Sequence, residues 1–196
     1  KFETDPRYNV AGEYYDEVGN VHYYDNETDN YRQHYVQAVW NHSFSPFLAW
    51  NNTLNFTKGD GYYENYKGDA KFSKYGLEPG LGMPGKSDFI VQQAMDNSFY
   101  AANTSLLYDR GYWKASAALS YGYYDGDHFG QVLWCKHMPL ESNFRWYENF
   151  GKKSDFSSFV RAEYSGIEDF TFFADLQYRG VRYLLEGIDK DFALLD

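Results

Sequence analysis

Apolar and polar residues alternate along several segments of the chain, and a period of two indicates β-strands rather than helices. In segment 31–44 the intervening positions are mainly polar, while one face carries Val36, Ala38, Trp40, His42 and Phe44. Counting such matches predicts six strands, at about 31–44, 47–58, 98–108, 112–124, 154–165 and 170–182. The expected fold is all-β, an antiparallel up-and-down meander of about six strands.

The expected connections between these strands are of two kinds. Short turns are expected at 45–46, 109–111 and 166–169, and long polar loops at 1–29, 59–97, 125–145 and 183–196. Because short and long connections alternate along the chain, every long loop leaves the sheet at the same end. Loops longer than about 15 residues are uncommon inside compact domains, whereas short turns at one end and long loops at the other are typical of outer-membrane barrels.

Strand length and the positions of aromatic residues agree with a membrane barrel. Ten residues at about 3.3 Å each, tilted by about 45°, rise roughly 23 Å, close to the apolar band of about 25 Å in such barrels. Trp40, Phe44, Trp50 and Trp113 lie beside expected short turns, where an aromatic girdle would lie. Alternation alone does not say which face is inside, but the position of the long loops favours a transmembrane β-barrel with the apolar face outward.

Composition narrows the range of partners. The formal net charge of -10 argues against nucleic acid, because phosphate binding needs a basic surface. Aromatic residues make up 21% of the chain although its mean hydropathy is -0.69, so the excess is amphipathic and suits half-wet surfaces. Cys135 is the one cysteine and permits no internal disulfide. No apolar run approaches 18 residues, so no transmembrane helix is expected.

Short motifs that could carry chemistry have simpler interpretations. GLGMPG at 80–85 matches the dinucleotide-binding pattern but is expected as a loop, because it contains a proline and opens no helix. DGDHFG at 125–130 could ligate a metal or act as acid and base, and is expected as a solvated turn. DNETDN at 25–30 could bind calcium, but solvated charge is the commoner explanation. We therefore expect no cofactor and no enzymatic activity.

The loops rich in aromatic and acidic residues are the best candidates for contact with a ligand. Sugar or cofactor rings could stack on their aromatic side chains, although packing of loops onto one another is an equal alternative. The candidate ligand-contact residues are Tyr62, Tyr63, Tyr66, Asp125, Asp127, His128, Trp134 and Trp146.

Three segments resemble the barrel of bacterial TonB-dependent outer-membrane receptors: GEYYDEVGNVHYYDNETDNYRQHYVQAVWNHSF, TLNFTKGDGYYENYKGDAKFSKYGL and YGYYDGDHFGQVLW. The resemblance implies a plugged barrel of about 22 strands in the outer membrane of a Gram-negative bacterium. It also implies import of an iron chelate, haem, a vitamin or a glycan, driven by the TonB energy-coupling system. Six strands do not close such a barrel, so the chain is expected to be an internal stretch that needs the remaining strands and the plug.

Two other classes of protein stay open at this stage. A soluble β-sandwich that binds carbohydrate through exposed aromatic side chains would show the same alternation, with its apolar face in a dry core between two sheets. A glycan-cleaving enzyme that uses loop carboxylates is a third and weaker alternative.

Overall fold

The computed structural model describes residues 3–4, 10–141 and 144–195, and six long strands dominate it. The strands are β3 (Asp29–Ser45), β4 (Leu48–Lys71), β5 (Lys86–Arg110), β6 (Trp113–Cys135), β7 (Phe144–Ile167) and β8 (Phe170–Ile188). Each pairs antiparallel with the next in chain order. The expected all-β antiparallel meander is confirmed.

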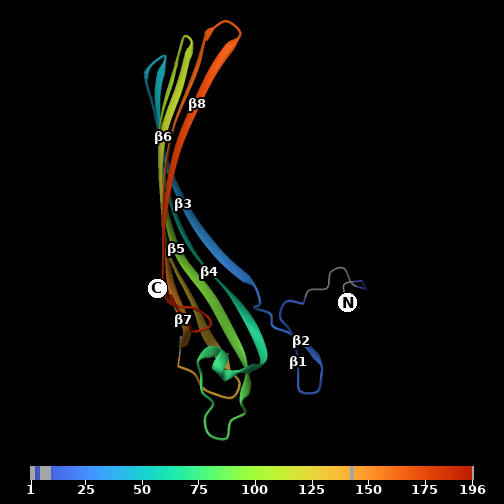
Figure 1. Ribbon diagram of the computed structural model, residues 1–196. Helices are drawn as coiled ribbons and strands as arrows, with labels where there is room; N and C mark the ends of the chain where they lie inside the picture. Colours follow the sequence, from blue (N-terminus) through green and yellow to red (C-terminus); the bar gives the residue numbers. More distant parts are fainter. Residues whose placement is uncertain (1–2, 5–9, 142–143, 196) are drawn as a thin grey trace.

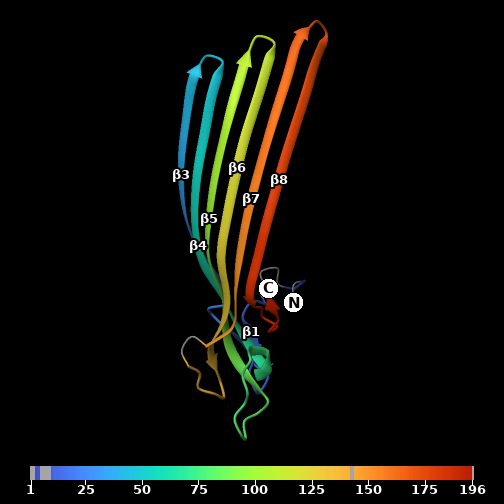
Figure 2. The same ribbon diagram turned by 60° about the vertical axis from the view of Figure 1, so that its left-hand side comes forward.

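Smaller elements gather at one end of this sheet. Strands β1 (Glu13–Tyr15) and β2 (Val21–Tyr23) form a separate hairpin, a 3-10 turn η1 (Phe72–Tyr75) follows β4, and β9 (Leu194–Leu195) pairs with the end of β8. The three hairpin turns lie together at the opposite end of the long strands (Figures 1 and 2). We call the part of the sheet next to these turns the turn half, and the part next to η1 the loop half.

The short turns fall where the sequence predicts them, but the long loops do not. Turns occur at 46–47, 111–112 and 168–169. The predictions of long loops at 59–97 and 125–145 are wrong over much of their length, because β4 continues to Lys71, β5 begins at Lys86 and β6 continues to Cys135. Polar residues occupy both faces there, and register shifts between Lys67 and Ala70 and between Val132 and Trp134 interrupt the alternation.

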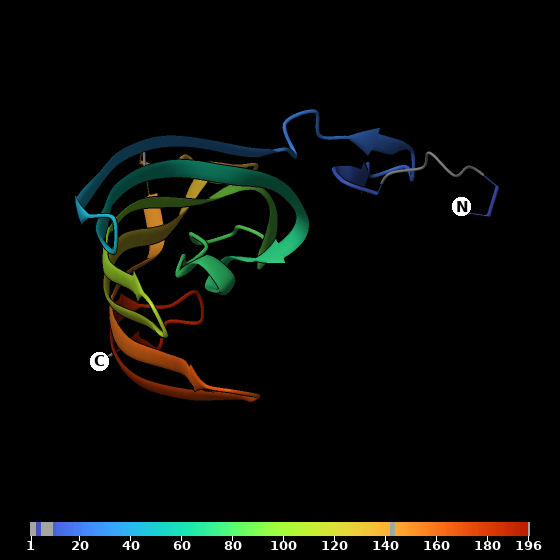
Figure 3. The same cartoon turned by 90° about the horizontal axis from the view of Figure 1, so that it is seen from above.

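All the apolar faces expected from the sequence lie on one side of the sheet. The register places Trp40, Asn52, Thr104, Leu119, Ser158 and Tyr178 side by side in one row across the six strands. Viewed along the strands, the sheet is curved and open, with η1 inside the curve (Figure 3). Because η1 packs against Phe89 and Val91 on the opposite face, the polar face is concave and the apolar face is convex.

Charge separates the two faces of the turn half. Between Arg110 at the turns and Arg182 towards the loop half, no convex position is Asp, Glu, Lys or Arg. The concave face carries charges over the same rows, including an ion pair of 3.2 Å between Arg161 and Asp175. The convex Asn52 is held by a chain of hydrogen bonds. The Trp50 indole N–H donates to the Thr104 hydroxyl (2.7 Å), and that hydroxyl donates to the Asn52 side-chain oxygen (2.8 Å).

The buried core is small and belongs to the loop half. Its hydrophobic members are Phe72, Tyr75, Phe89, Val91, Val132, Cys135 and Trp146. In the turn half the convex side chains are uncovered, with Leu54 60% and Leu176 76% exposed. The outer edges of β3 and of most of β8 have no neighbouring strand among the described residues. No helix in the described part of the chain has the length and apolarity that a membrane span requires.

Candidate functional site

The eight candidate ligand-contact residues do not form one site, because they lie on both faces of the sheet. Alternation along β4 and β6 puts Tyr62, Tyr66, Asp125 and Asp127 on the convex side, and a bulge at Leu133 turns Trp134 to the same side. The other three, Tyr63, His128 and Trp146, belong to the concave side. The register therefore separates residues that are neighbours in sequence.

The DGDHFG motif lies inside β6, so its expectation as a solvated turn is wrong. Asp125 and Asp127 project from one face and His128 from the other, because successive strand residues alternate. These three side chains cannot converge on one ion. Over the described residues, no group of three or more His, Cys, Asp and Glu side chains has a geometry that could hold a metal.

A hollow on the concave face is lined by three of the candidates, Tyr62, Tyr63 and His128. Tyr63 and His128 line it with Gln93 and Tyr147, and its volume is about 230 Å³. The Tyr147 hydroxyl donates to Oε1 of Gln93 at 3.3 Å. Burial, and then the neighbouring Tyr63, raise the pKa of Tyr147 to about 12, so its hydroxyl remains a hydrogen-bond donor at neutral pH. The sequence could not indicate Gln93 and Tyr147, because only the strand register places them here.

Trp146 is a core residue rather than an exposed stacking surface. It is the extra residue of a β-bulge, since Gly130 pairs with Tyr147 and Gln131 with Arg145. Its ring is 8% exposed and meets the Tyr75 ring edge-on, with centroids 5.2 Å apart. A Cβ on Gly130 would lie 2.5 Å from the indole, so glycine is needed for this packing.

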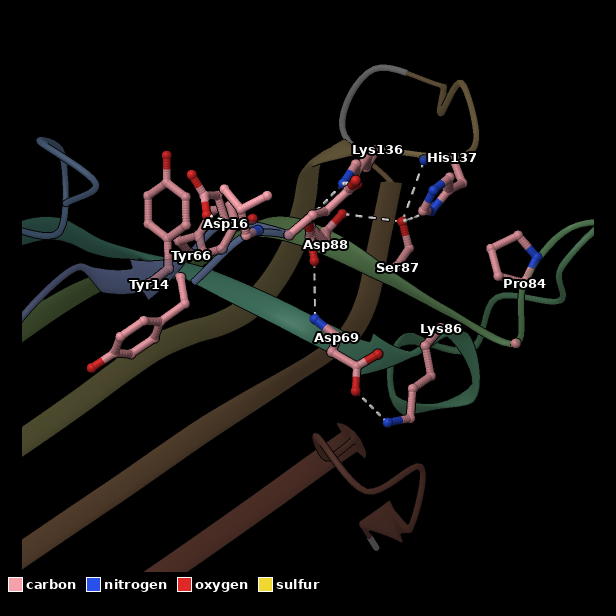
Figure 4. A pocket seen from close by; sticks show the side chains of 14 residues that line it. Tyr14, Asp16, Tyr66, Asp69, Pro84, Lys86, Ser87, Asp88, Lys136 and His137 are labelled. Atoms are coloured by element: carbon pink, nitrogen blue, oxygen red, sulfur yellow. Dashed lines mark hydrogen bonds and ion pairs between the residues drawn. The ribbon is translucent and has the colours of Figure 1, made fainter. Parts of the chain in front are cut away.

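A larger cavity of about 930 Å³ lies between the β1–β2 hairpin and the ends of β4, β5 and β6 (Figure 4). Tyr14 of the hairpin packs on Tyr66 of β4, with ring centroids 4.1 Å apart. Lys136 reaches across to Glu17 at 3.0 Å. These contacts attach the hairpin to the loop half.

The charged groups of this cavity are already paired with one another. Lys136 lies 3.5 Å from Asp88, whose Oδ1 accepts from the Asp69 amide at 3.0 Å, and Lys86 pairs with Asp69 (Figure 4). Burial acts to raise the pKa of Asp88, but the Asp69 amide, Tyr66 and Lys136 hold it below its usual range. Burial and the Asp88 carboxylate raise the pKa of Tyr66. The arrangement is typical of a structural joint.

Ser87 and His137 also serve this joint. The Ser87 hydroxyl is buried and lies 3.0 Å from Nδ1 of His137, whose backbone amide also donates to it at 3.3 Å (Figure 4). The Cys135 thiol donates to the same oxygen at 3.4 Å. A hydroxyl with this many partners fixes the segment after β6 onto β5.

No protein-family model matches the chain, and comparison with curated proteins gives no match. Its function must therefore be inferred from the sequence pattern and the geometry.

Proposed function

We propose that the chain is part of the barrel of a TonB-dependent outer-membrane receptor, with its convex face toward lipid and its concave face toward the lumen. Its task is to bind a scarce nutrient and let it pass, without chemistry on the cargo. The nutrient is an iron chelate, haem, a vitamin or a glycan. The partners are the bilayer, the plug, the remaining strands and the TonB energy-coupling system.

The absence of charge from the convex face of the turn half is the observation that carries this proposal. The uncharged rows run along β8 from Phe172 to Gly180, bounded by Arg182. Ten steps of about 3.3 Å between Phe172 and Arg182, tilted by about 45°, give roughly 23 Å, close to the apolar band of an outer-membrane barrel. An apolar surface of this extent, exposed as on Leu176, is costly in water and favourable in lipid.

The open edges of the sheet support a larger barrel. Strand β3 has 17 residues and β8 has 19, and among the described residues the outer edge of β3 and that of β8, apart from its pairing with β9, present rows of unpaired backbone groups. Such groups must be hydrogen-bonded inside a bilayer, which a closed barrel achieves by adding strands at both edges. A β-sandwich would instead need a second sheet over the convex face, and the described residues place none there.

The concave face supplies polar groups for a ligand. It carries the ion-paired residues of the turn half and the hollow lined by Tyr63 and His128 in the loop half. The loop half lies at the end opposite the short turns, which is the extracellular end in such barrels. Ligand capture is therefore assigned to this half.

Heat-dependent migration of the full-length protein tests the barrel. Outer membranes would be solubilised in mild detergent, and the protein run on a gel before and after boiling. A closed barrel should run as a compact species unless boiled. Recovery without detergent, together with identical migration before and after boiling, would argue for the soluble alternative.

A growth comparison tests the receptor function itself. Cells that carry or lack the gene would be grown with iron chelates, haem, vitamins or glycans as the limiting nutrient. We expect one class to support growth only when both the gene and the TonB system are intact. Equal growth of both strains on every class would contradict a role in uptake.

A further inference from the structure

A second cavity on the concave side of the loop half, of about 700 Å³, differs in charge from the rest of the molecule. It lies between β4, η1 and the turn that follows β8, with η1 and this turn inside the curve of the sheet (Figure 3). Four lysines line it, namely Lys67, Lys71, Lys74 and Lys190. Asp191 supplies the one carboxylate in the lining. This concentration of ammonium groups contrasts with the net charge of -10 for the whole chain.

These four lysines are unpaired, in contrast to other lysines of the loop half. Lys58, Lys86 and Lys136 each contact a carboxylate. Among the described residues, no side chain forms an ion pair or hydrogen bond with the ammonium groups of the four cavity lysines. Cations that share a cavity repel one another, so an anion bound among them would be stabilised by all four.

Tyr75 adds a second, independent indication of a ligand. It lines the same cavity and is 2% exposed, and among the described residues its hydroxyl has no hydrogen-bond partner. An unsatisfied buried hydroxyl is unfavourable and rare. Burial raises the pKa of Tyr75 to about 12, so at neutral pH the group is a donor, and a ligand oxygen that reaches it would satisfy it.

The turn after β8 is held in place over the cavity. Oδ1 of Asp189 accepts from the amides of Asp191 (2.9 Å) and Ala193 (2.8 Å). The Phe192 ring packs against Gly76 at the end of η1, where an added Cβ would lie 3.0 Å from the ring. Phe192 itself has a φ of 63°, a conformation unusual for a bulky residue. These contacts position Lys190 beside the lysines of β4 and η1.

We propose that this cavity binds a small ligand that carries two or more carboxylate or phosphate groups. The ammonium groups supply charge-assisted hydrogen bonds, the Tyr75 hydroxyl supplies one more, and the half-exposed ring of Phe192 offers an apolar contact. As a cargo site, the cavity rests on the proposed receptor function. Whether the cavity binds such a ligand can be tested independently of the receptor function.

Calorimetric titration of the full-length protein in detergent tests the site, with citrate and tripolyphosphate as probes. The variant Lys71→Gln/Lys74→Gln should bind at least one probe about tenfold more weakly than the wild type. The control Lys114→Gln/Lys153→Gln removes the same charge from the concave face outside the cavity and should bind as the wild type does. Restoring charge with Lys71→Arg/Lys74→Arg should recover most of the affinity.

Tyr75→Phe separates binding from folding. The ring stays in the core and only the unpartnered hydroxyl is lost, so the thermal midpoint should stay the same or rise while probe binding weakens several-fold. The proposal is overturned if neither probe binds the wild type more tightly than the double lysine variant. That outcome would leave heat-dependent migration unchanged, so it is distinguishable from failure of the barrel proposal.

Discussion

The turn half and the loop half contain the same six strands but bury different surfaces. In the loop half, η1 covers the concave face and encloses a core that includes Phe89, which is fully buried. In the turn half no segment in the described part of the chain covers the apolar side chains, and Leu176 is largely exposed. One sheet is therefore suited to two surroundings, protein and water at one end and, under the proposed function, lipid at the other.

The largest expected difference in stability between the halves comes from comparing the removal of one aromatic ring in the loop half with the removal of one in the turn half. Phe89→Ala leaves a cavity in packed protein and should lower the free energy of unfolding by about 3–5 kcal/mol. Phe172→Ala, on the convex face beside a turn, should cost less than about 1 kcal/mol, because lipid fills the space. Urea titration of the full-length protein in lipid vesicles measures both. Equal losses would contradict different surroundings for the two halves.

The next largest effect is the difference in stability when a charge is introduced on the convex or the concave face of the turn half. Leu176→Arg puts a charge in the middle of the uncharged convex rows and should cost about 2–4 kcal/mol, whereas its neighbour Gln177→Arg on the concave face should cost less than about 1 kcal/mol. The same urea titration would measure the difference. A smaller penalty at Leu176 than at Gln177 would reverse the proposed orientation.

The smallest effect concerns pH and the β1–β2 hairpin of the loop half. Asp16 accepts from the amides of Val18 (3.0 Å) and Asn20 (2.8 Å). Hydrogen bonds with His22 and then with Asn20 hold the pKa of Asp16 well below its usual range. Since the folded pKa is depressed, this stabilisation is complete above the unfolded value of about 3.9 and is lost as the pH falls through the folded value.

Hydrogen exchange of the hairpin, corrected for intrinsic rates, checks this prediction. Protection of residues 13–23 should fall as the pH is lowered from about 6 to about 3. Asp16→Asn keeps an acceptor oxygen but does not titrate in this range, so its protection should fall less than that of the wild type, with the remaining fall due to other carboxylates such as Glu17, which pairs with Lys136. Wild-type protection that is as high at pH 3 as at pH 6 would contradict a stabilising role of the ionised Asp16 in the hairpin.

The turn half could be predicted from the sequence because its two faces differ in polarity. Period-two counting identified the face that carries Trp40, Leu119 and Leu176, and the structure places all three on the convex side. The three short turns were located to within about two residues. Strict alternation is informative only where one face is apolar throughout.

The loop half could not be predicted in the same way. Segment 58–71, KGDGYYENYKGDAK, has polar residues on both faces and three glycines, so it lacks the signature of a strand. Bulges shift the pairing near Lys67 and Trp146 and reverse which residues share a face. The lysine cavity combines residues of β4, η1 and the turn after β8. Because these segments lie far apart in sequence, no local motif predicts the cavity.

Spin-label accessibility at adjacent positions of β8 tests most directly whether the convex face contacts lipid. With the buried Cys135 replaced by serine, single labels would be placed at Leu176 and Gln177 of the full-length protein in lipid vesicles. We predict that molecular oxygen relaxes the label at Leu176 more strongly and a water-soluble nickel complex relaxes the label at Gln177 more strongly. Stronger relaxation of the Leu176 label by the nickel complex would contradict a lipid-facing convex surface.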